Sequence, residues 1–308
     1  MENIVIIGSG AAGYTAGVYA ARANLEPKLI SGVLPGGLLT LTTDVENYPG
    51  FPEAINGFEL MFKFQQQAER FGTKIINETV VSADLKEGGP QKITLGSGEI
   101  IETKALIIAT GASPRWLGLE SEDRLKNKGV TACATCDGAF YRDVPVVVIG
   151  GGDTAVEEAV FLTKFASEVT IIHRRDELRA SKIMANRALE NPKIKMAWNS
   201  VVSEVLGENQ VEGVRVKDVN TGEERIIKCA GYFAALGHVP NTQIFKDLID
   251  TNDAGYISLK DSSSYTSMDG VFAAGDCADH VYRQAITAAG SGCKAAIDAE
   301  RWLDSKNA

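Results

Sequence analysis

Two cysteines three positions apart, followed directly by an aspartate, are the residues of this sequence best suited to covalent chemistry. They lie in TACATCDGAF, residues 131–140, as Cys133, Cys136 and Asp137. Such a pair can be half of a zinc site, a structural disulfide, or a redox pair. Thiol–disulfide exchange needs an attacking thiolate, a second thiol that resolves the mixed disulfide, and a group that moves protons. Asp137 can be that group if burial raises its pKa.

Zinc and a permanent disulfide both fit this pattern poorly. A structural zinc site takes four ligands, commonly from a second CxxC or a histidine pair. A disulfide across two intervening residues closes a very small loop, so it stabilises the fold little. The sequence therefore favours a redox pair. The remaining cysteines and histidines are scattered without ligand spacing: Cys229, Cys277, Cys293, His173, His238 and His280.

A glycine turn near the N-terminus predicts a nucleotide site. Gly8, Gly10 and Gly13 form GxGxxG between an aliphatic run and an alanine-rich stretch. In a strand–turn–helix unit the first glycine allows the tight turn, and the second lets the backbone approach a pyrophosphate. The third lets the helix pack closely on the strand. An NAD site usually has an acid about 20 positions further on, but here EPKLISG ends at Ser31 with no acid.

A second glycine turn, GGGDTA at 150–155, fits GxGxxA. Its following strand, EVTII, leads directly into His173, Arg174 and Arg175, with Arg179 one turn later. Guanidinium groups at this position can form paired hydrogen bonds to a 2′-phosphate. The alternative is a solvated basic start of a helix. We therefore expect NADPH rather than NADH at this turn.

If the cysteine pair is redox-active, electrons must pass between it and the nucleotides bound at the two glycine turns. A nicotinamide and a dithiol each exchange two electrons, but hydride does not pass directly to a disulfide at a useful rate. A flavin reacts with both, and the protein's part is to bind and orient it. We therefore expect FAD at the first turn.

Composition limits the class of protein. A chain of 308 residues is long for one core, so two domains are expected. The formal net charge of −9 argues against nucleic acid as a partner, because phosphate binding relies on a basic surface. The opening MENIVIIGSG has neither a basic leader nor a long apolar run, so we expect no membrane span and a cytoplasmic location.

An internal repeat predicts the fold class. Residues 4–17, IVIIGSGAAGYTAG, and residues 146–159, VVVIGGGDTAVEEA, share one pattern of strand, glycine turn and helix. Aliphatic runs without polar alternation are typical of parallel strands buried on both faces. The sequence therefore predicts an α/β fold with two nucleotide-binding units.

Further elements are expected around these units. The spacing predicts a helix over 58–71 that ends at Gly72, with one apolar face. Buried strands are expected in 105–113 and 270–278, each ending in a glycine turn. A closing helix is expected over 282–303, although two internal glycines weaken that prediction. The apolar face of the first helix comprises Met61, Phe64, Ala68 and Phe71. The two internal glycines of the closing helix are Gly290 and Gly292.

Several segments together resemble the bacterial-type, low-molecular-weight NADPH-dependent thioredoxin reductases, over essentially the full chain. ACATCDG and HRRDELRA are specific to this group, whereas the glycine turns are shared with many flavoproteins. The other matching segments are IIGSGAAGYTAGVYAARA, TDVENYPG, ATGAS, IGGGDTAVEEA, ALGHVPN and AAGDCADHVYRQAITAAGSGC.

The resemblance implies two Rossmann-like dinucleotide-binding domains of the flavoprotein disulfide reductase type. An FAD domain, residues 1–116 and 242–308, would be interrupted by an NADPH domain, residues 117–241, that carries the cysteine pair. Electrons would pass from NADPH through FAD and the Cys133–Cys136 disulfide to oxidised thioredoxin. Cys136 would face the flavin, Cys133 would exchange with thioredoxin, and Asp137 would act as the general acid.

The resemblance also implies the cofactor-binding residues. Asp276 would hold the flavin ribitol. The family usually has GGQL where this chain has GGLL, so Leu38 removes an expected amide contact to the flavin. The expected flavin residues are Gly8, Gly10, Ala11, Gly13, Gly36, Gly37, Leu38, Asn47, Thr110, Gly111, Asp276, Arg283, Gln284 and Ala285. The expected NADPH residues are Gly150, Gly152, Asp153, Thr154, His173, Arg174, Arg175 and Arg179.

A homodimer is implied as well, together with rotation of the inserted domain about segments 113–118 and 237–243. Four alternatives remain open. The partner can be a peroxiredoxin or glutaredoxin-like protein, although that type of reductase has extra domains before the first strand. The chain can be a ferredoxin-dependent relative, whose second nucleotide site is degenerate. It can also be a small-molecule dithiol oxidase, or a non-enzymatic flavin-binding redox sensor.

Overall fold

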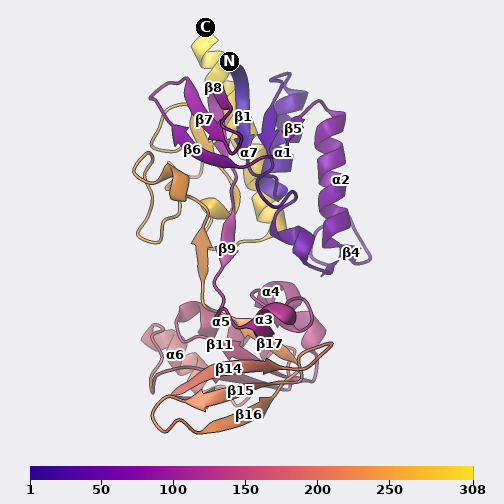
Figure 1. Cartoon of the computed structure of the whole chain (residues 1–308), viewed down its shortest axis with the longest axis vertical. Coiled ribbons are helices and arrows are strands. Elements are labelled where there is room, and N and C mark those ends of the chain that lie inside the picture. The colour runs from indigo at the N-terminus through magenta and orange to yellow at the C-terminus, as the bar shows by residue number, and fades with distance from the viewer. Residues whose placement is uncertain (308) are drawn as a thin grey trace. The chain divides into compact units, whose positions relative to one another are not determined.

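The computed structural model describes residues 1–307, which form two compact units (Figure 1). The first unit comprises residues 1–113 together with the chain from Val239 onwards, and the second comprises Pro114–His238. The junctions thus lie at 113/114 and 238/239, where the sequence predicts 116/117 and 241/242. Which cofactor each unit binds remains a prediction at this stage.

The sheet of the first unit has seven strands in the order β5-β2-β1-β8-β7-β6, with β19 also paired to β8. Its central strands are parallel and buried, as the aliphatic runs predict. β6 and β7 are antiparallel additions at one edge, which the sequence analysis did not anticipate. The strands are β1 (Glu2–Ile7), β2 (Lys28–Ile30), β5 (Lys74–Ile76), β6 (Val80–Asp84), β7 (Gln91–Leu95), β8 (Ile100–Ile108) and β19 (Val271–Ala273).

Three helices belong to this unit: α1 (Ala11–Arg22), α2 (Gly57–Arg70) and α7 (Ala285–Asn307). α2 begins where the Asn56 side chain accepts a hydrogen bond from the Phe58 N–H at 3.0 Å, which is a standard helix cap. It ends before Gly72, which has a φ of +104°. The short elements nearby are β3 (Asp44–Val45), β4 (Ile55–Asn56), η1 (Leu38–Leu41), η3 (Gln243–Phe245) and η4 (Gly275–Cys277).

α7 is continuous through both of its glycines. A Cβ on Gly292 would lie 2.1 Å from the carbonyl oxygen of Ala12, so this glycine lets α7 approach the start of α1. The helix begins at Ala285 rather than at Tyr282 as predicted. The reason is that Arg283 has a φ of +47°, outside the right-handed helical region.

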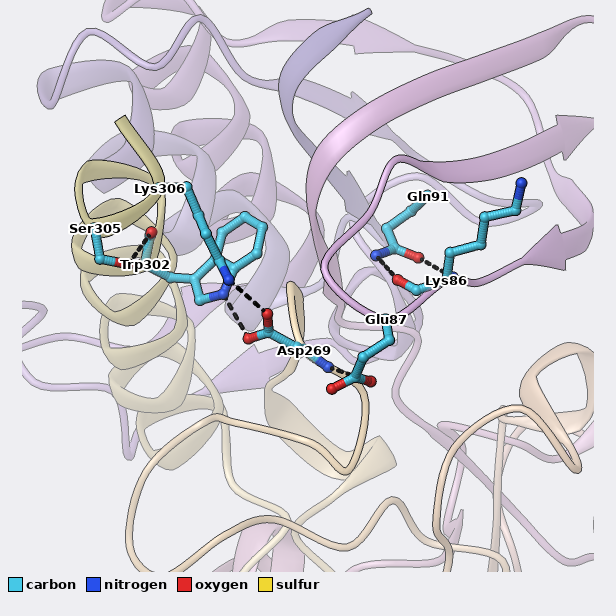
Figure 2. A network of polar contacts seen from close by, with 7 residues as sticks. All are labelled: Lys86, Glu87, Gln91, Asp269, Trp302, Ser305 and Lys306. Carbon is cyan, nitrogen blue, oxygen red and sulfur yellow. Dashed lines mark hydrogen bonds and ion pairs between the residues drawn. The ribbon is translucent and has the colours of Figure 1, made fainter. Parts of the chain in front are cut away.

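A polar network fixes the end of α7 to the loop before β19 (Figure 2). The Asp269 carboxylate accepts a hydrogen bond from Trp302 Nε1 at 2.6 Å and pairs with Lys306 Nζ at 3.0 Å. The backbone N–H of Asp269 donates to Glu87 Oε2 at 3.3 Å. The last helix is therefore joined to two separate loops of the first unit.

The second unit contains a five-stranded parallel sheet in the order β10-β17-β11-β12-β13. A three-stranded antiparallel sheet, β14-β15-β16, accompanies it and was not predicted. The strands are β10 (Val130–Thr131), β11 (Pro145–Ile149), β12 (Glu168–Ile172), β13 (Ile194–Ala197), β14 (Ser200–Leu206), β15 (Gly213–Asp218), β16 (Glu224–Lys228) and β17 (Gly231–Ala234). The helices are α3 (Glu120–Arg124), α4 (Ala134–Asp137), η2 (Gly138–Tyr141), α5 (Asp153–Leu162) and α6 (Lys182–Leu189).

The chain crosses between the units twice. The crossing segments, β9 (Ala112–Pro114) and β18 (His238–Pro240), pair with each other as a two-stranded sheet. Gly111 and Gly237 flank them with φ values of +72° and +85°, which favour glycine. Within residues 1–307, no helix combines the length and apolar character needed to span a bilayer.

Candidate active site

Cys133 and Cys136 form a disulfide bond at the start of α4. The short strand β10 delivers the chain to Cys133, and a single helical turn then places Cys136 beside it. The backbone N–H of Cys136 donates to Cys133 Sγ at 3.2 Å, and the Thr135 hydroxyl lies 3.4 Å from the same sulfur. Cys136 is exposed and Cys133 is half-buried. The pair can therefore open and close without rearrangement of a core.

Asp137 lies at the end of α4 and is half-buried. Burial raises the pKa of its carboxyl group, and a hydrogen bond from the Thr131 hydroxyl partly opposes that rise. A carboxyl with a raised pKa holds its proton closer to neutral pH, so Asp137 can serve as a proton donor beside the sulfur pair. Asp137 could be predicted from the sequence, whereas Thr131 could not.

The first glycine turn has the geometry expected of a phosphate-binding turn. Gly8 has a φ of +107°, and a Cβ there would lie 2.2 Å from the carbonyl oxygen of Ala109. A Cβ on Gly13 would lie 1.8 Å from the Gly8 carbonyl oxygen. A Cβ on Gly10, in contrast, would meet no protein atom within 4 Å, so the backbone at the start of α1 is open to a ligand. Ala11 is the first residue of that helix.

The loop of Gly36 and Gly37 lies against this turn. Ser9 connects them: its hydroxyl donates to the Ser31 carbonyl oxygen at 2.7 Å and accepts from the Gly36 N–H at 2.9 Å. A Cβ on Gly37 would lie 3.3 Å from Gly10 Cα. Ser9 is a residue of the site that the sequence analysis missed, because its spacing carries no signal of this contact.

The predicted flavin residues near the C-terminus also lie in this unit. Asp276 follows β19, and burial raises the pKa of its carboxyl group to about 6. Its Oδ1 is buried without a hydrogen-bond partner, so a ligand hydroxyl would satisfy it. Gln284 Oε1 accepts from Asn47 Nδ2 at 3.4 Å, which joins two predicted residues far apart in sequence. Leu38, Arg283 and Ala285 lie at or next to helix starts: Leu38 begins η1, Arg283 precedes α7, and Ala285 begins α7.

Thr110 and Gly111 follow β8, and a second missed residue holds them. Asn241 Nδ2 donates to the Thr110 carbonyl oxygen at 2.9 Å, and the Asn241 N–H donates to the Gly111 carbonyl oxygen at 2.9 Å. Thr110 Oγ1 is itself buried without a partner. Open backbone at Gly10 and two unsatisfied oxygens on one unit are features that a bound flavin dinucleotide would complete, so the residues fit FAD.

The second glycine turn repeats this geometry in the other unit. A Cβ on Gly150 would lie 2.6 Å from the Ala235 carbonyl oxygen, whereas one on Gly152 would meet no protein atom within 4 Å. Asp153 and Thr154 begin α5, and Asp153 Oδ1 accepts the Ser181 N–H at 2.8 Å. The backbone at Gly152 is therefore open to a phosphate, as at Gly10.

The residues after β12 divide into one buried ring and three exposed cations. His173 is only 5% exposed, and a Cβ on Gly151 would lie 2.3 Å from its ring. Burial lowers the pKa of His173, and the positive charges of Arg179 and Arg175 lower it further. Arg174, Arg175 and Arg179 are exposed, so their guanidinium groups can reach a solvent-facing phosphate. The His173 ring thus packs against the glycine turn at Gly151, whereas the arginines carry the exposed positive charge of this site.

The chain is similar to known proteins over almost its whole length. Residues 2–292 match the family model described as pyridine nucleotide-disulphide oxidoreductase. The chain belongs to this family. Among curated pyridine nucleotide-disulphide oxidoreductases, it is 53% identical over 304 residues to the thioredoxin reductase of Streptomyces clavuligerus, covering 98% of this chain and 94% of that protein.

Solved structures from the same family agree with this placement. The chain is 45% identical to the thioredoxin reductase from Giardia duodenalis, with a TM-score of 0.94 and coverage of 98% of both chains. It is 42% identical to that of Streptococcus pyogenes MGAS5005, with a TM-score of 0.94 and coverage of 99% of both chains. The resemblance to low-molecular-weight thioredoxin reductases and the predicted fold class are thus confirmed. Thioredoxin reductases of this family use FAD and NADPH.

Proposed function

We propose that this chain is an NADPH-dependent thioredoxin reductase that uses FAD and the Cys133–Cys136 pair. In the overall reaction, NADPH, one proton and a protein disulfide give NADP⁺ and a protein dithiol. The observation that carries the proposal is the disulfide at the start of α4 with the carboxyl of Asp137 beside it. The identity with curated thioredoxin reductases supports the same substrate.

The cysteine pair exchanges two electrons with the partner protein in two steps. The Cys133 thiolate attacks one sulfur of the partner's disulfide, which forms a mixed disulfide and releases the other sulfur as a thiolate. Asp137 gives that thiolate its proton. The Cys136 thiolate then attacks Cys133 Sγ, which closes the Cys133–Cys136 disulfide and releases the partner's second sulfur as a thiolate. That thiolate takes a proton from solvent, so the partner leaves as a dithiol. The partner gains two electrons and the pair is left oxidised.

The first unit holds FAD in this proposal. The open backbone at Gly10 and the neighbouring Gly36–Gly37 loop would hold the pyrophosphate, and the unpartnered Asp276 carboxylate would accept hydrogen bonds from the ribitol hydroxyls. Asn47, Gln284 and the start of α7 would hold the ring. When bound, FAD supplies two-electron transfer between the nicotinamide and the cysteine pair.

The second unit holds NADPH. Gly152 and the start of α5 bind its pyrophosphate, and Arg174, Arg175 and Arg179 bind its 2′-phosphate. His173 has a lowered pKa and stays neutral at neutral pH, so the positive charge at this site comes from the arginines. Because the redox pair and the NADPH residues belong to one unit, we propose that this unit rotates about β9 and β18 so that each can meet the flavin in turn.

Three further properties are part of the proposal. We propose a homodimer, by analogy with the related enzymes, and sedimentation of the flavin-loaded protein tests it. We propose a cytoplasmic location, because a dithiol of this kind works in a reducing compartment, and cell fractionation tests it. The formal net charge of −9 supports the expectation that nucleic acid is not a partner.

The decisive experiment compares Cys136→Ser with Cys293→Ser in NADPH oxidation assays with and without thioredoxin. Removing the resolving sulfur should lower thioredoxin-dependent turnover roughly 1,000-fold or more, because the residues of such a unit act together. Cys293 is a half-buried cysteine of α7 outside the redox pair, so its variant should keep full turnover. Oxygen consumption driven by a small dithiol, without NADPH or thioredoxin, would favour a dithiol oxidase. Retained turnover in Cys136→Ser would contradict the proposal.

A further inference from the structure

One hydroxyl group contacts both the proton donor and the backbone of the redox pair. Thr131, the last residue of β10, donates its hydroxyl hydrogen to Asp137 Oδ2. The same oxygen accepts the backbone N–H of Cys133 at 3.2 Å. Thr131 lies outside the CATC motif, so no pattern in the sequence assigned it a role. Its hydroxyl uses its one donor hydrogen and one of its two acceptor lone pairs on these two partners.

We propose that Thr131 is a positioning residue that fixes the Asp137 carboxyl relative to the Cys133 backbone and sets the pH range of proton donation. The inference rests on the proposed function, since it assumes that Asp137 donates a proton during turnover. A threonine is suited to this task because its branched side chain has few rotamers, which keeps the hydroxyl in place. Thr131 itself gives up no proton to the substrate.

The balance of effects on Asp137 explains why a hydroxyl matters here. Burial favours the neutral carboxylic acid and raises its pKa. The hydrogen bond from Thr131 favours the charged carboxylate and lowers the pKa. Without Thr131 only the raising effect would remain, so Asp137 would keep its proton to higher pH. The hydroxyl thus lowers the pH at which the group releases its proton.

The other ionisable groups near Asp137 do not replace this hydrogen bond. Burial and the negative charge of Asp137 raise the pKa of the Tyr141 phenol to about 12. Tyr141 is therefore neutral during turnover. Cys229 lies near Tyr141, and burial raises the pKa of its thiol to about 12. The neighbouring elements carry further ionisable side chains: Asp153, Glu157 and Glu158 on α5, Tyr232 on β17, and the reduced thiols of Cys133 and Cys136.

The test uses Thr131→Val, which keeps the shape of the side chain and removes its hydroxyl, and Thr131→Ser, which restores the hydroxyl. The pH profile of thioredoxin reduction should fall at high pH as Asp137 loses its proton. In Thr131→Val that fall should move to higher pH by about one to two units, because hydrogen bonds to charged groups are strong. Turnover at neutral pH should drop roughly 10-fold. Thr131→Ser should restore both readings.

Two outcomes would overturn the inference. An unshifted pH profile in Thr131→Val, with turnover merely reduced, would mean that the residue only supports the local fold. A pH profile that stays shifted in Thr131→Ser, which keeps the hydroxyl, would show that the hydroxyl is not the cause of the shift. Thr170→Val, a similar exchange in β12, is the matched control and should leave the profile unchanged. Thermal unfolding should show that all three variants are folded.

A further measurement, the rate of flavin reduction by NADPH, distinguishes a failure of this inference from a failure of the proposed function. Anaerobic bleaching of the flavin by NADPH does not involve the proton of Asp137, so Thr131→Val should bleach at the rate of the unmodified protein. If the unmodified protein fails to reduce thioredoxin at all, the proposed function is wrong. If it turns over normally and only the expected shift in Thr131→Val is missing, the inference about Thr131 alone fails.

Discussion

The two glycine turns share their geometry at two positions and differ at the other two. In each turn the first glycine lies against the carbonyl oxygen of a neighbouring strand end, Ala109 in one unit and Ala235 in the other. The third position of the motif is open in both, at Gly10 and Gly152. The turns thus offer the same backbone surface to a pyrophosphate.

The differences lie at the second and last positions. Ser9 bonds the first turn to the tip of β2 and to the Gly36 loop, whereas Gly151 leaves room for the His173 ring. Gly13 is forced by a close carbonyl oxygen, whereas the second turn accepts Ala155. Because the two turns share one backbone shape, the choice of dinucleotide depends on the side chains at the end of the next strand.

The largest expected effect breaks the first turn alone. In Gly13→Ala the new Cβ would lie 1.8 Å from the Gly8 carbonyl oxygen, so helix and strand must separate. We expect a loss of at least about 3 kcal/mol in unfolding free energy and loss of flavin absorbance after purification. Ala155→Gly, the reverse exchange in the second turn, should cost only about 1 kcal/mol. Denaturant unfolding followed by circular dichroism measures both, and equal costs would contradict the difference between the turns.

A second prediction concerns the charge after β12. Arg174→Ala combined with Arg175→Ala should raise the KM for NADPH roughly 10- to 100-fold, because charge-assisted hydrogen bonds to the 2′-phosphate are lost. The KM for NADH should change little, since that dinucleotide lacks the phosphate. Lys182→Ala, on the nearby helix α6, is the matched control for a lost surface charge. A parallel rise for both dinucleotides would show that the arginines act on the fold rather than on the phosphate.

The third and smallest prediction concerns Asp276, which lies in the first unit. Its pKa is about 6 in the folded protein against an ordinary value of 3.8, so the folded state binds the proton more tightly. The contribution of Asp276 to the stability of the flavin-free protein should therefore be most favourable below pH 4 and be lost as the pH rises through 6. Asp276→Asn should remove this loss and raise the unfolding free energy at pH 8 by about 1 to 3 kcal/mol.

The same variant should bind FAD more weakly, because an amide is a poorer acceptor for ribitol hydroxyls than a carboxylate. Unfolding measured at pH 4 and pH 8, with and without added FAD, separates the two effects. A gain in stability that is equal at both pH values would show that the charge of Asp276 is not its source.

Much of the parallel framework could be predicted from the sequence. Uninterrupted aliphatic runs marked β1, β11 and β12, because strands buried on both faces need apolar residues at every position. The helix over 58–71 was placed within one residue of α2 (Gly57–Arg70), because its apolar face and Gly72 agree. In contrast, the antiparallel sheet β14-β15-β16 was missed, because one of its faces is exposed and its strands carry charges.

The contacts within the site were less predictable. The bonds of Ser9, Thr131 and Asn241 join positions whose separation in sequence follows no motif, so only the folded chain brings them together. Gly292 was judged a weakness of the last helix, since glycine lowers helix propensity. The close approach of Ala12 gives it a packing role that local propensity does not contain.

That contact between α1 and α7 also has a consequence for biosynthesis. A ribosome makes Ala12 before the whole second unit and Gly292 after it, so the first unit stays incomplete until Gly292 has been synthesised. The second unit is one uninterrupted stretch, and we expect it to fold while still tethered, ahead of the segments that flank it. The nascent chain would thus present β1 and α1 without α7 until the second unit has been made, which makes that strand–helix segment the expected target for chaperones.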